Sequence, residues 1–343
     1  MDGFIKISKY AGMREDLVQA GGGNSSYKIS EDKMMIKAFG YQLADISGEE
    51  GYALVNPRII REKFLHCKNL DTLADSDSKM FLDEAFIKGD RPSIETFLHS
   101  ISGKYTLHTH PLAVNVLTCR KGGMDTLKKI FPDSLFVPYA TPGIELAKAY
   151  FKAYRGRVVN EQGMFDIVFL QNHGLVVSAD TADEVMEKTE MVTRKIEEYI
   201  GADLSAYHDM TRLWEFFADK IIWKVTDENI LNVFRKTGGW KHAFCPDCVV
   251  FLGRKCLKLS KGFTETDIKR FYDCYGVPVM IDYEGILYIV ANSVKKALET
   301  QSVMSFSVQV MGLNEGYECN LLSEEEQDFL LDWDAEKYRK DIR

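Results

Sequence analysis

The segment DRPSIETFLHSISGKYTLHTHPLAVNVLTC, Asp90–Cys119, decides the fold of this 343-residue chain. It places one carboxylate, Glu95, thirteen positions before a His-Thr-His triplet that ends a short apolar stretch. Alternate residues of a β-strand point to the same face of a sheet. An extended segment from Tyr105 onward therefore projects His108 and His110 together, where both can bind one ion.

A third histidine follows another apolar run, Ile167–Leu170, within the sequence Gln171-Asn172-His173-Gly174. A catalytic zinc site has three protein ligands and an open position for substrate, whereas a structural zinc site is closed by four ligands. A His-x-His pair alone is more typical of two solvated or hydrogen-bonded histidines on a strand. The third histidine, together with Glu95 on an expected helix after Arg91-Pro92-Ser93, favours an open zinc site instead.

The order of these motifs resembles that of the class II aldolase family, which includes fuculose- and rhamnulose-phosphate aldolases and the adducin head. Three of the shared motifs are Ser93-Ile94-Glu95, His108-Thr109-His110 and Asn172-His173-Gly174. The family's glycine-rich start is matched by Gly21–Ser26, which precedes a predicted strand, Met34–Ala38. The aldolase part of rhamnulose-1-phosphate aldolase/lactaldehyde dehydrogenase fusions is the most similar, since it shares the GGGNSS, PSIET and HTHP stretches.

This resemblance implies that His108, His110 and His173 bind one Zn²⁺ and that Glu95 is the catalytic acid/base. The chemistry of the residue types agrees with that assignment. Retro-aldol cleavage of a ketose leaves an enediolate, whose charge a divalent cation stabilises. A carboxylate beside the cation can move the proton on that enediolate.

The resemblance also implies a site for a substrate phosphate, formed by Gly23, Asn24, Ser25, Gly40 and Ser93. Two residues depart from the phosphate-site pattern of the family. Phe39 stands where a hydroxyl side chain is usual, and Ile94 replaces a second serine of the fuculose-type enzymes. Three glycines alone are more typical of an ordinary flexible turn than of an anion site. Whether the substrate carries phosphate therefore stays open at this point.

For residues 1–205 we expect a three-layer α/β/α domain with a mixed, mostly antiparallel sheet, as the resemblance implies. A helical connection is expected over 206–239, and a smaller C-terminal α/β domain over 240–343. This second domain shows a faint internal repeat of the first. Pro132-Asp133 resembles Pro246-Asp247, and His173-Gly174 resembles Glu284-Gly285. Two expected helix N-caps, Thr181 and Asn292, are separated by the same number of positions as His173 and Glu284.

The repeat predicts a degenerate copy of the second half of the aldolase domain, with Glu284 in place of the third ligand. Because the second domain has no His-x-His motif, it should not form a zinc site of this kind. The alternative is a chance similarity between two strand-turn-helix units.

The seven cysteines are an odd, scattered set, which is typical of reduced thiols in a cytosol. The pair Cys245-Pro-Asp-Cys248 lacks the second Cys-x-x-Cys of a zinc ribbon. A thioredoxin-like role requires the pair to open a helix, but Val249–Leu252 predicts a strand. We therefore expect a structural role for these two cysteines.

Composition excludes several classes of partner. The formal net charge is −8 and no dense Lys/Arg stripe is present, which argues against nucleic acid or an anionic membrane as partner. No apolar run approaches the eighteen or so residues that span a bilayer. The N-terminal residues lack the pattern of a secretory signal. We expect a cytoplasmic protein that acts on a small molecule.

The leading interpretation is zinc-dependent aldol cleavage of a ketose or ketose 1-phosphate. A deoxy-sugar phosphate would yield dihydroxyacetone phosphate and lactaldehyde. Epimerases and dehydratases of the same superfamily share the three histidines, and adducin-like heads keep the fold without the metal. A Schiff-base aldolase using Lys37 is disfavoured, because that lysine sits in a family strand motif without a catalytic role. Related aldolases are commonly tetramers, so a homo-oligomer is expected.

Overall fold

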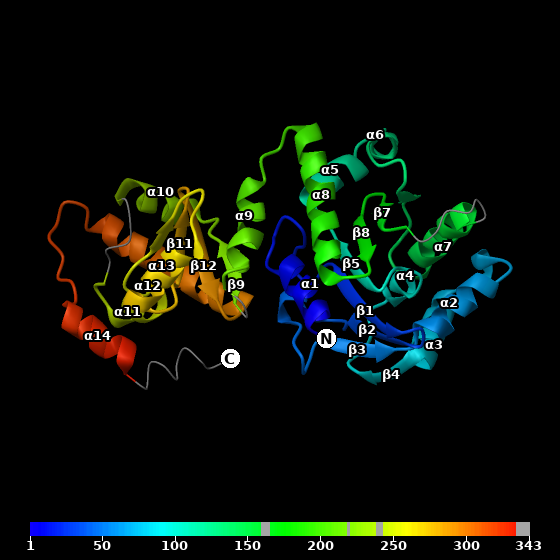
Figure 1. Ribbon diagram of the computed structural model, residues 1–343, viewed down its shortest axis with the longest axis horizontal. Coiled ribbons are helices and arrows are strands. Elements are labelled where there is room, and N and C mark those ends of the chain that lie inside the picture. Colours follow the sequence, from blue (N-terminus) through cyan, green and yellow to red (C-terminus); the bar gives the residue numbers. More distant parts are fainter. Residues whose placement is uncertain (159–164, 218–219, 238–242, 334–343) are drawn as a thin grey trace. The chain divides into compact units, whose positions relative to one another are not determined.

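The computed structural model describes residues 1–158, 165–217, 220–237 and 243–333 (Figure 1). The chain divides into two compact units, Met1–Leu204 and Ser205–Arg343. Within the described ranges, no helix is both long enough and apolar enough to cross a membrane.

The N-terminal unit is built on one eight-stranded sheet, in which the strands lie in the order β4-β3-β2-β1-β5-β8-β7-β6. Its strands are β1 (Asn24–Ser30), β2 (Lys33–Lys37), β3 (Tyr52–Val55), β4 (Phe86–Gly89), β5 (Tyr105–Thr109), β6 (Leu135–Val137), β7 (Ile167–Leu170) and β8 (Gly174–Ala179). Neighbouring strands are antiparallel except β6 and β7, which are parallel. The expected mixed, mostly antiparallel sheet is confirmed.

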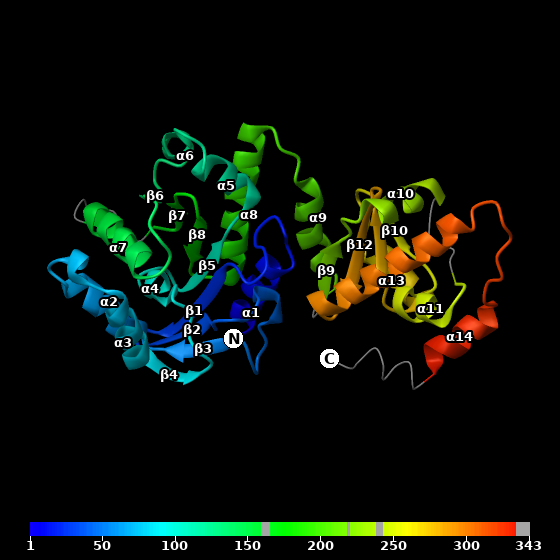
Figure 2. The same ribbon diagram turned by 180° about the vertical axis from the view of Figure 1, so that it is seen from behind.

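Helices cover both faces of this sheet and complete the expected three layers (Figures 1 and 2). One layer contains α1 (Asp2–Gly12), α5 (Leu112–Thr118) and α8 (Ala182–Ile200), and α6 (Gly123–Ile130) packs on α5. The other layer contains α2 (Pro57–His66), α4 (Thr96–Ser100) and α7 (Ile144–Val158), and α3 (Asp75–Ala85) packs on α2. Two short 3-10 turns, Leu43–Asp45 and Leu70–Thr72, join these elements.

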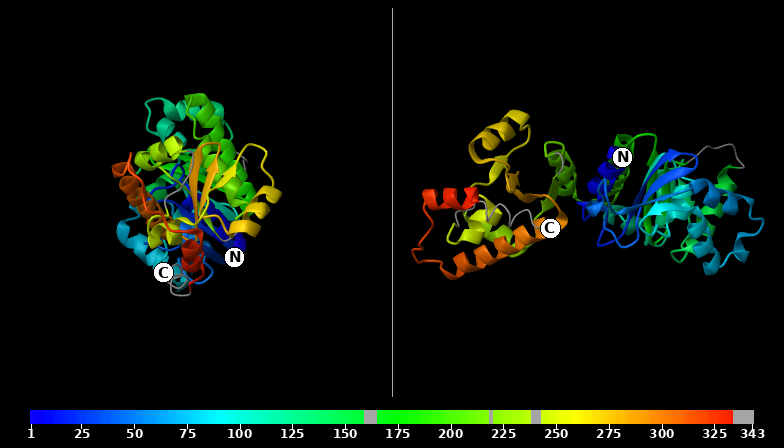
Figure 3. Two further views of the ribbon diagram at one scale, coloured as in Figure 1. Left: turned by 90° about the vertical axis from the view of Figure 1, so that its left-hand side faces the viewer. Right: turned by 90° about the horizontal axis from the view of Figure 1, so that it is seen from below.

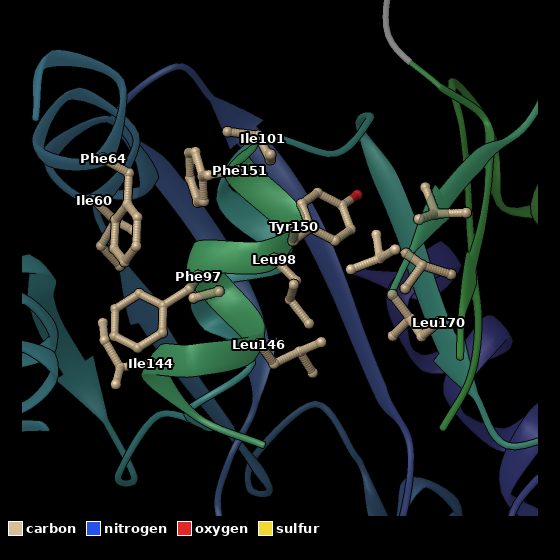
Figure 4. Close-up of a cluster of buried hydrophobic side chains, with 14 of the residues drawn as sticks. Ile60, Phe64, Phe97, Leu98, Ile101, Ile144, Leu146, Tyr150, Phe151 and Leu170 are labelled. Atoms are coloured by element: carbon tan, nitrogen blue, oxygen red, sulfur yellow. The ribbon is translucent and has the colours of Figure 1, made fainter. Parts of the chain in front are cut away.

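The core between the sheet and the second layer fixes the short helix α4 (Figure 4). Phe64 of α2 and Phe151 of α7 stack with ring centroids 4.4 Å apart. Phe97 of α4 packs against Phe64 at 5.4 Å and is fully buried. Burying each such side chain stabilises the fold by about 1.5–3 kcal/mol. This packing holds α4 on the sheet and thereby positions Glu95, which immediately precedes the helix.

The C-terminal unit contains a four-stranded sheet in the order β10-β11-β12-β9. Its elements are α9 (Ser205–Trp214), β9 (Ile221–Lys224), α10 (Glu228–Thr237), α11 (Pro246–Leu252), β10 (Leu257–Leu259), α12 (Glu265–Tyr275), β11 (Met280–Tyr283), β12 (Ile286–Ala291), α13 (Val294–Leu313) and α14 (Glu324–Asp332). Helices α12 and α13 lie on opposite sides of this sheet (Figure 3).

The C-terminal unit repeats the topology of the second half of the N-terminal unit. Chain order is α4-β5-α5-α6-β6-α7-β7-β8-α8 in one and α9-β9-α10-α11-β10-α12-β11-β12-α13 in the other. The corresponding sheet orders are β5-β8-β7-β6 and β9-β12-β11-β10. One pair in each is parallel, β6 with β7 and β10 with β11, and the other pairs are antiparallel. The topology thus agrees with the expected half-repeat.

The register of this repeat differs from the one expected from sequence. The N-cap of α13 is Ser293, not Asn292, and it stands 112 positions after Thr181, the N-cap of α8. The same offset places Glu284, with φ of 52°, on Asn172, with φ of 53°. Glu284 therefore takes the place of Asn172, and Gly285 takes the place of the third histidine.

The segment expected to be a helical connection, 206–239, belongs to the C-terminal unit. Its strand β9 pairs with β12, for example Trp223 with Ile289, so the sheet of this unit begins before residue 240. In the sequence, Ile221, Ile222 and Trp223 directly follow a stretch rich in aromatic residues, and the strand could not be distinguished from that stretch.

The run Val249–Leu252 is helical, not a strand, and it belongs to α11. Pro246 occupies the first turn, where its missing N–H costs no hydrogen bond, and Cys245 is the N-cap. Helix α11 packs against α13 and α14, so burial outweighs the β propensity of two adjacent valines. The expected match between Pro132 and Pro246 fails for the same reason, because Pro132 precedes a strand.

Candidate metal centre

The three predicted ligands come together at one end of the central strands. His108 lies on β5, His110 follows that strand, and His173 lies in the turn between β7 and β8. The His108 Nε2 atom is 3.1 Å from His110 Nε2 and 3.3 Å from His173 Nε2. Among the described residues, these three form the one cluster of His, Cys, Asp or Glu with ligand atoms close enough to hold a metal, all within 4.8 Å.

These separations fit one zinc ion. A Zn–N bond is about 2.0–2.1 Å, and tetrahedral geometry then separates two ligand nitrogens by about 3.3 Å. The His108 Nδ1–H donates to the Leu175 carbonyl at 3.0 Å, because a carbonyl oxygen only accepts. This bond occupies Nδ1, so Nε2 is the nitrogen of His108 that can bind a cation once it is deprotonated, and it faces the other two imidazoles.

Glu95 lies beside this cluster. Its Oε1 atom is 3.3 Å from His108 Nε2 and 3.7 Å from His173 Nε2, and its side chain is 17% exposed. Burial raises the pKa of Glu95. The charge of His108 and the hydrogen bond between His108 and Glu95 lower this pKa by more than burial raises it, so the net shift is downward. The carboxylate form is therefore favoured at this position.

Two of the imidazoles are held in the form that binds a cation. Burial lowers the pKa of His110 to about 3, and the charge of His108 contributes in the same direction. Burial and His108 likewise lower the pKa of His173 to about 4. Burial lowers the pKa of His108, but Glu95 raises it more, so its net shift is upward. A metal ligand must be deprotonated, which His110 and His173 already are near neutral pH.

Three glycines allow the backbone to approach the histidines. A Cβ on Gly22 would lie 2.9 Å from His110 Nδ1, and one on Gly23 would lie 2.9 Å from the His108 carbonyl oxygen. A Cβ on Gly174 would overlap the Thr109 carbonyl oxygen. The glycine-rich loop and the Asn-His-Gly turn therefore pack directly on the His-x-His segment.

The residues expected to bind phosphate differ in how they are placed relative to the histidines and Glu95. Asn24 pairs directly with His108 across β1 and β5, and its buried Oδ1 has no hydrogen-bond partner within the described part of the chain. Ser93 is buried, and its Oγ accepts a hydrogen bond from the Glu95 N–H at 3.2 Å. Gly40 has φ of 88°, and the Ala38–Pro92 bridge brings its segment beside Ser93.

The structure directs the Ser25 side chain elsewhere. Its hydroxyl forms a 2.7 Å hydrogen bond with the Ser8 hydroxyl of α1. Neighbouring residues on a strand point to opposite faces, so Ser25 points away from the face that carries Asn24 and His108. The Ser25 side chain is therefore not brought to the cluster, and its backbone belongs to β1.

Lys37 was not predicted as a site residue, yet it lies at the site. Its ammonium is buried and donates to the Gly21 carbonyl at 3.4 Å. Burial lowers the pKa of Lys37, while the charge of Glu95 opposes that shift. The sequence signal was a lysine directly after the apolar strand residues Met34–Ile36.

The two apolar departures, Phe39 and Ile94, line a cavity of about 710 Å³ together with Arg91 and Lys79. Phe39 is 64% exposed and Ile94 is 41% exposed. The Arg91 guanidinium lies 5.2 Å from the centre of the Phe39 ring. Apolar side chains thus flank the segment that carries Ser93.

A three-layer domain with three convergent histidines and an adjacent carboxylate defines a class of metal-binding α/β proteins. The chain belongs to the class II aldolase and adducin N-terminal domain family, whose model matches residues 4–200. It is also similar to the uncharacterized oxidoreductase YuxG of Bacillus subtilis (strain 168), with 29% identity over 197 residues, which cover 53% of this chain. The chain spans only 27% of the length of YuxG, which is compatible with the expected likeness to a fusion.

A solved structure agrees with the family. The N-terminal class II aldolase domain of a conserved protein from Thermoplasma acidophilum is 25% identical, with a TM-score of 0.50. That match covers 58% of this chain and 92% of the other. A sugar-phosphate aldolase from Thermotoga maritima is 17% identical with a TM-score of 0.40, and the match covers 58% of this chain and 94% of the other.

Proposed function

We propose that this chain is a zinc-dependent aldolase that cleaves a ketose or a ketose 1-phosphate. The observation that carries the proposal is the convergence of His108, His110 and His173 around one point, with Glu95 Oε1 3.3 Å from His108 Nε2. When bound there, a divalent cation supplies positive charge where negative charge develops on the substrate oxygens.

In this proposal, Glu95 transfers the proton at the carbon next to the ketose carbonyl. In the aldol direction the carboxylate, which its lowered pKa keeps ionised, removes that proton; in cleavage the same group returns the proton to the enediolate carbon after the carbon–carbon bond has broken. The Ser93 hydroxyl holds the backbone turn that carries Glu95. Buried packing of α4 fixes the same turn from the other side. The proton acceptor is thus positioned before substrate arrives.

We further propose that the anionic end of the substrate binds at the glycine loop. Lys37 supplies a buried positive charge there, and the glycine turn that precedes β1 lets its backbone approach an anion. In this proposal Asn24, Gly40 and Ser93 also contribute, since the Ala38–Pro92 bridge brings the segments of Gly40 and Ser93 together, whereas the Ser25 hydroxyl, which is bonded to Ser8, does not. A deoxy-sugar phosphate is the substrate class that suits both this charge and the apolar Phe39 and Ile94.

The test combines metal analysis with a screen of ketose 1-phosphates for release of dihydroxyacetone phosphate. We expect bound zinc, cleavage of at least one such substrate, and loss of activity on chelation. Borohydride should trap no substrate on the enzyme; a trapped adduct would assign the chemistry to Lys37 or another lysine. Epimerisation without fragmentation would favour the epimerase class, and absence of both reactions would favour an adducin-like head.

A further inference from the structure

Cys245 and Cys248 form a close pair of thiols that the proposed function leaves unused. Cys245 is the N-cap of α11 and Cys248 lies in the first turn of that helix. Their Sγ atoms are 3.3 Å apart, with Cys245 partly exposed and Cys248 buried. A disulfide requires a sulfur separation of about 2.05 Å, so the gap to close is about 1.2 Å.

The surroundings of the pair give its members different roles. Cys248 borders a cavity of about 360 Å³ that Arg254, Lys255 and Tyr275 also line. Burial raises the pKa of Cys248 to about 12, and the neighbouring Cys245 thiol contributes in the same direction. Cys245 is the more accessible thiol, so it meets a reagent from solvent first.

Among the residues that the structure describes, no further ligand group joins Cys245 and Cys248, whereas a zinc site built on cysteines needs four ligands. A structural role was expected because a strand was predicted after the pair. The pair instead begins a helix, so that reason no longer holds. Two adjacent thiols of unequal exposure are instead the arrangement that thiol–disulfide exchange requires.

We propose that Cys245 and Cys248 form a reversible intramolecular disulfide, so that the pair is a redox modification site whose oxidant is a low-molecular-weight disulfide. The Cys245 thiolate attacks one sulfur of the oxidant, forms a mixed disulfide and releases the first small thiol. Cys248 then attacks the Cys245 sulfur, closes the ring and releases the second small thiol. The oxidant gains two electrons, and the two cysteine protons leave on the two released thiols.

The test uses the full chain in mixtures of glutathione and glutathione disulfide of increasing oxidising power. Acid quenching, labelling with N-ethylmaleimide and trypsin digestion then report each thiol. Cleavage after Lys241 and Arg254 gives one peptide, 242–254, which contains both cysteines of the pair and no other cysteine. We expect this peptide to lose both labels and two hydrogens, and dithiothreitol to restore both labels. Exposed Cys274 serves as the internal control and should form no intramolecular link.

Single variants check the order of the two steps. Cys248→Ser should leave a stable glutathione adduct on Cys245, because the resolving thiol is absent. Cys245→Ser should prevent both the adduct on the pair and the ring, whereas Cys274→Ser should leave the ring unchanged. The proposal is overturned if peptide 242–254 keeps both labels at the most oxidising ratio. It is equally overturned if each thiol carries glutathione without a ring, or if either one links to a different cysteine.

Discussion

Glu95 Oε1 lies 3.3 Å from His108 Nε2, although the two residues come from different elements of the fold. Glu95 begins α4, which the apolar core holds on the sheet, and His108 lies on β5 within that sheet. The carboxylate and the candidate metal ligands are therefore positioned by separate sets of contacts. This separation predicts that zinc binding and proton transfer can be disrupted independently.

Replacing His110 should remove the metal. His110→Ala leaves two of three imidazoles, and we expect zinc content to fall from about one per chain to a trace. The measurement is plasma mass spectrometry on protein dialysed against metal-free buffer. His66→Ala is the matched control, because His66 is exposed on α2 and belongs to no cluster of ligands among the described residues. Retention of full zinc by His110→Ala would remove this residue from the site.

Replacing Glu95 should slow the reaction without removing zinc. Glu95→Gln keeps the size of the side chain but cannot accept a proton, so kcat should fall by about 10²-fold or more. Zinc content should stay at the wild-type level. Glu62→Gln is the control, since Glu62 pairs with Arg58 on the exposed side of α2. A fully active Glu95→Gln enzyme would exclude this carboxylate from proton transfer.

Adding one methyl group at Gly174 should destabilise the N-terminal unit. The new Cβ would overlap the Thr109 carbonyl oxygen, and strand β8 would have to move away from β5. Overpacking of this kind costs about 1–3 kcal/mol. Gly156→Ala in α7 is the matched control, because no atom lies within 4 Å of a Cβ there. Chemical denaturation should show lower stability for Gly174→Ala and unchanged or slightly higher stability for Gly156→Ala.

Buried His99 should make the stability of the N-terminal unit depend on pH. Its Nδ1 shares a 2.7 Å hydrogen bond with the Ser26 hydroxyl. Burial lowers the pKa of His99 to about 3, compared with 6.5 for a histidine in water. Between these two pH values the unfolded chain binds the additional proton, so this contribution to stability is complete above pH 6.5 and is lost as pH falls toward 3.

The check compares wild type with His99→Asn in urea at several pH values, with chelator present so that metal release does not contribute. The difference in free energy of unfolding should shrink as pH falls, by about 1.4 kcal/mol per pH unit. Circular dichroism follows both units, whereas all four tryptophans lie in the C-terminal unit and report it separately. Parallel curves for the two proteins would contradict the assigned role of His99.

Sequence reasoning was most successful where local pattern and tertiary contact agree. The common direction of His108 and His110 follows from strand geometry alone, and Thr181 is the N-cap of α8 as expected. The third histidine lies far away in the chain; its position after a second apolar run suggested it, and the resemblance supported its role as a ligand. Its place in the cluster depends on the pairing of β5 with β8, for which a single sequence gives no local signal.

The errors arose where burial or pairing outweighed local preference. Val249 and Val250 favour a strand, yet packing of α11 against α13 keeps them helical. Ser25 was grouped with Asn24 by its position in the loop, but alternation along β1 turns its hydroxyl toward Ser8. Lys37 was read as an ordinary strand residue, because its distance from Glu95 depends on how β2 and α4 are placed.

The most direct measurement is zinc X-ray absorption spectroscopy on the purified, zinc-loaded chain. We predict a first shell containing three imidazole nitrogens at about 2.0–2.1 Å, with the remaining position filled by oxygen. His173→Ala should reduce the imidazole signal by one ligand or abolish binding. A sulfur-containing shell, a shell with fewer than three imidazoles, or no bound zinc in the wild-type chain would contradict the proposed metal centre.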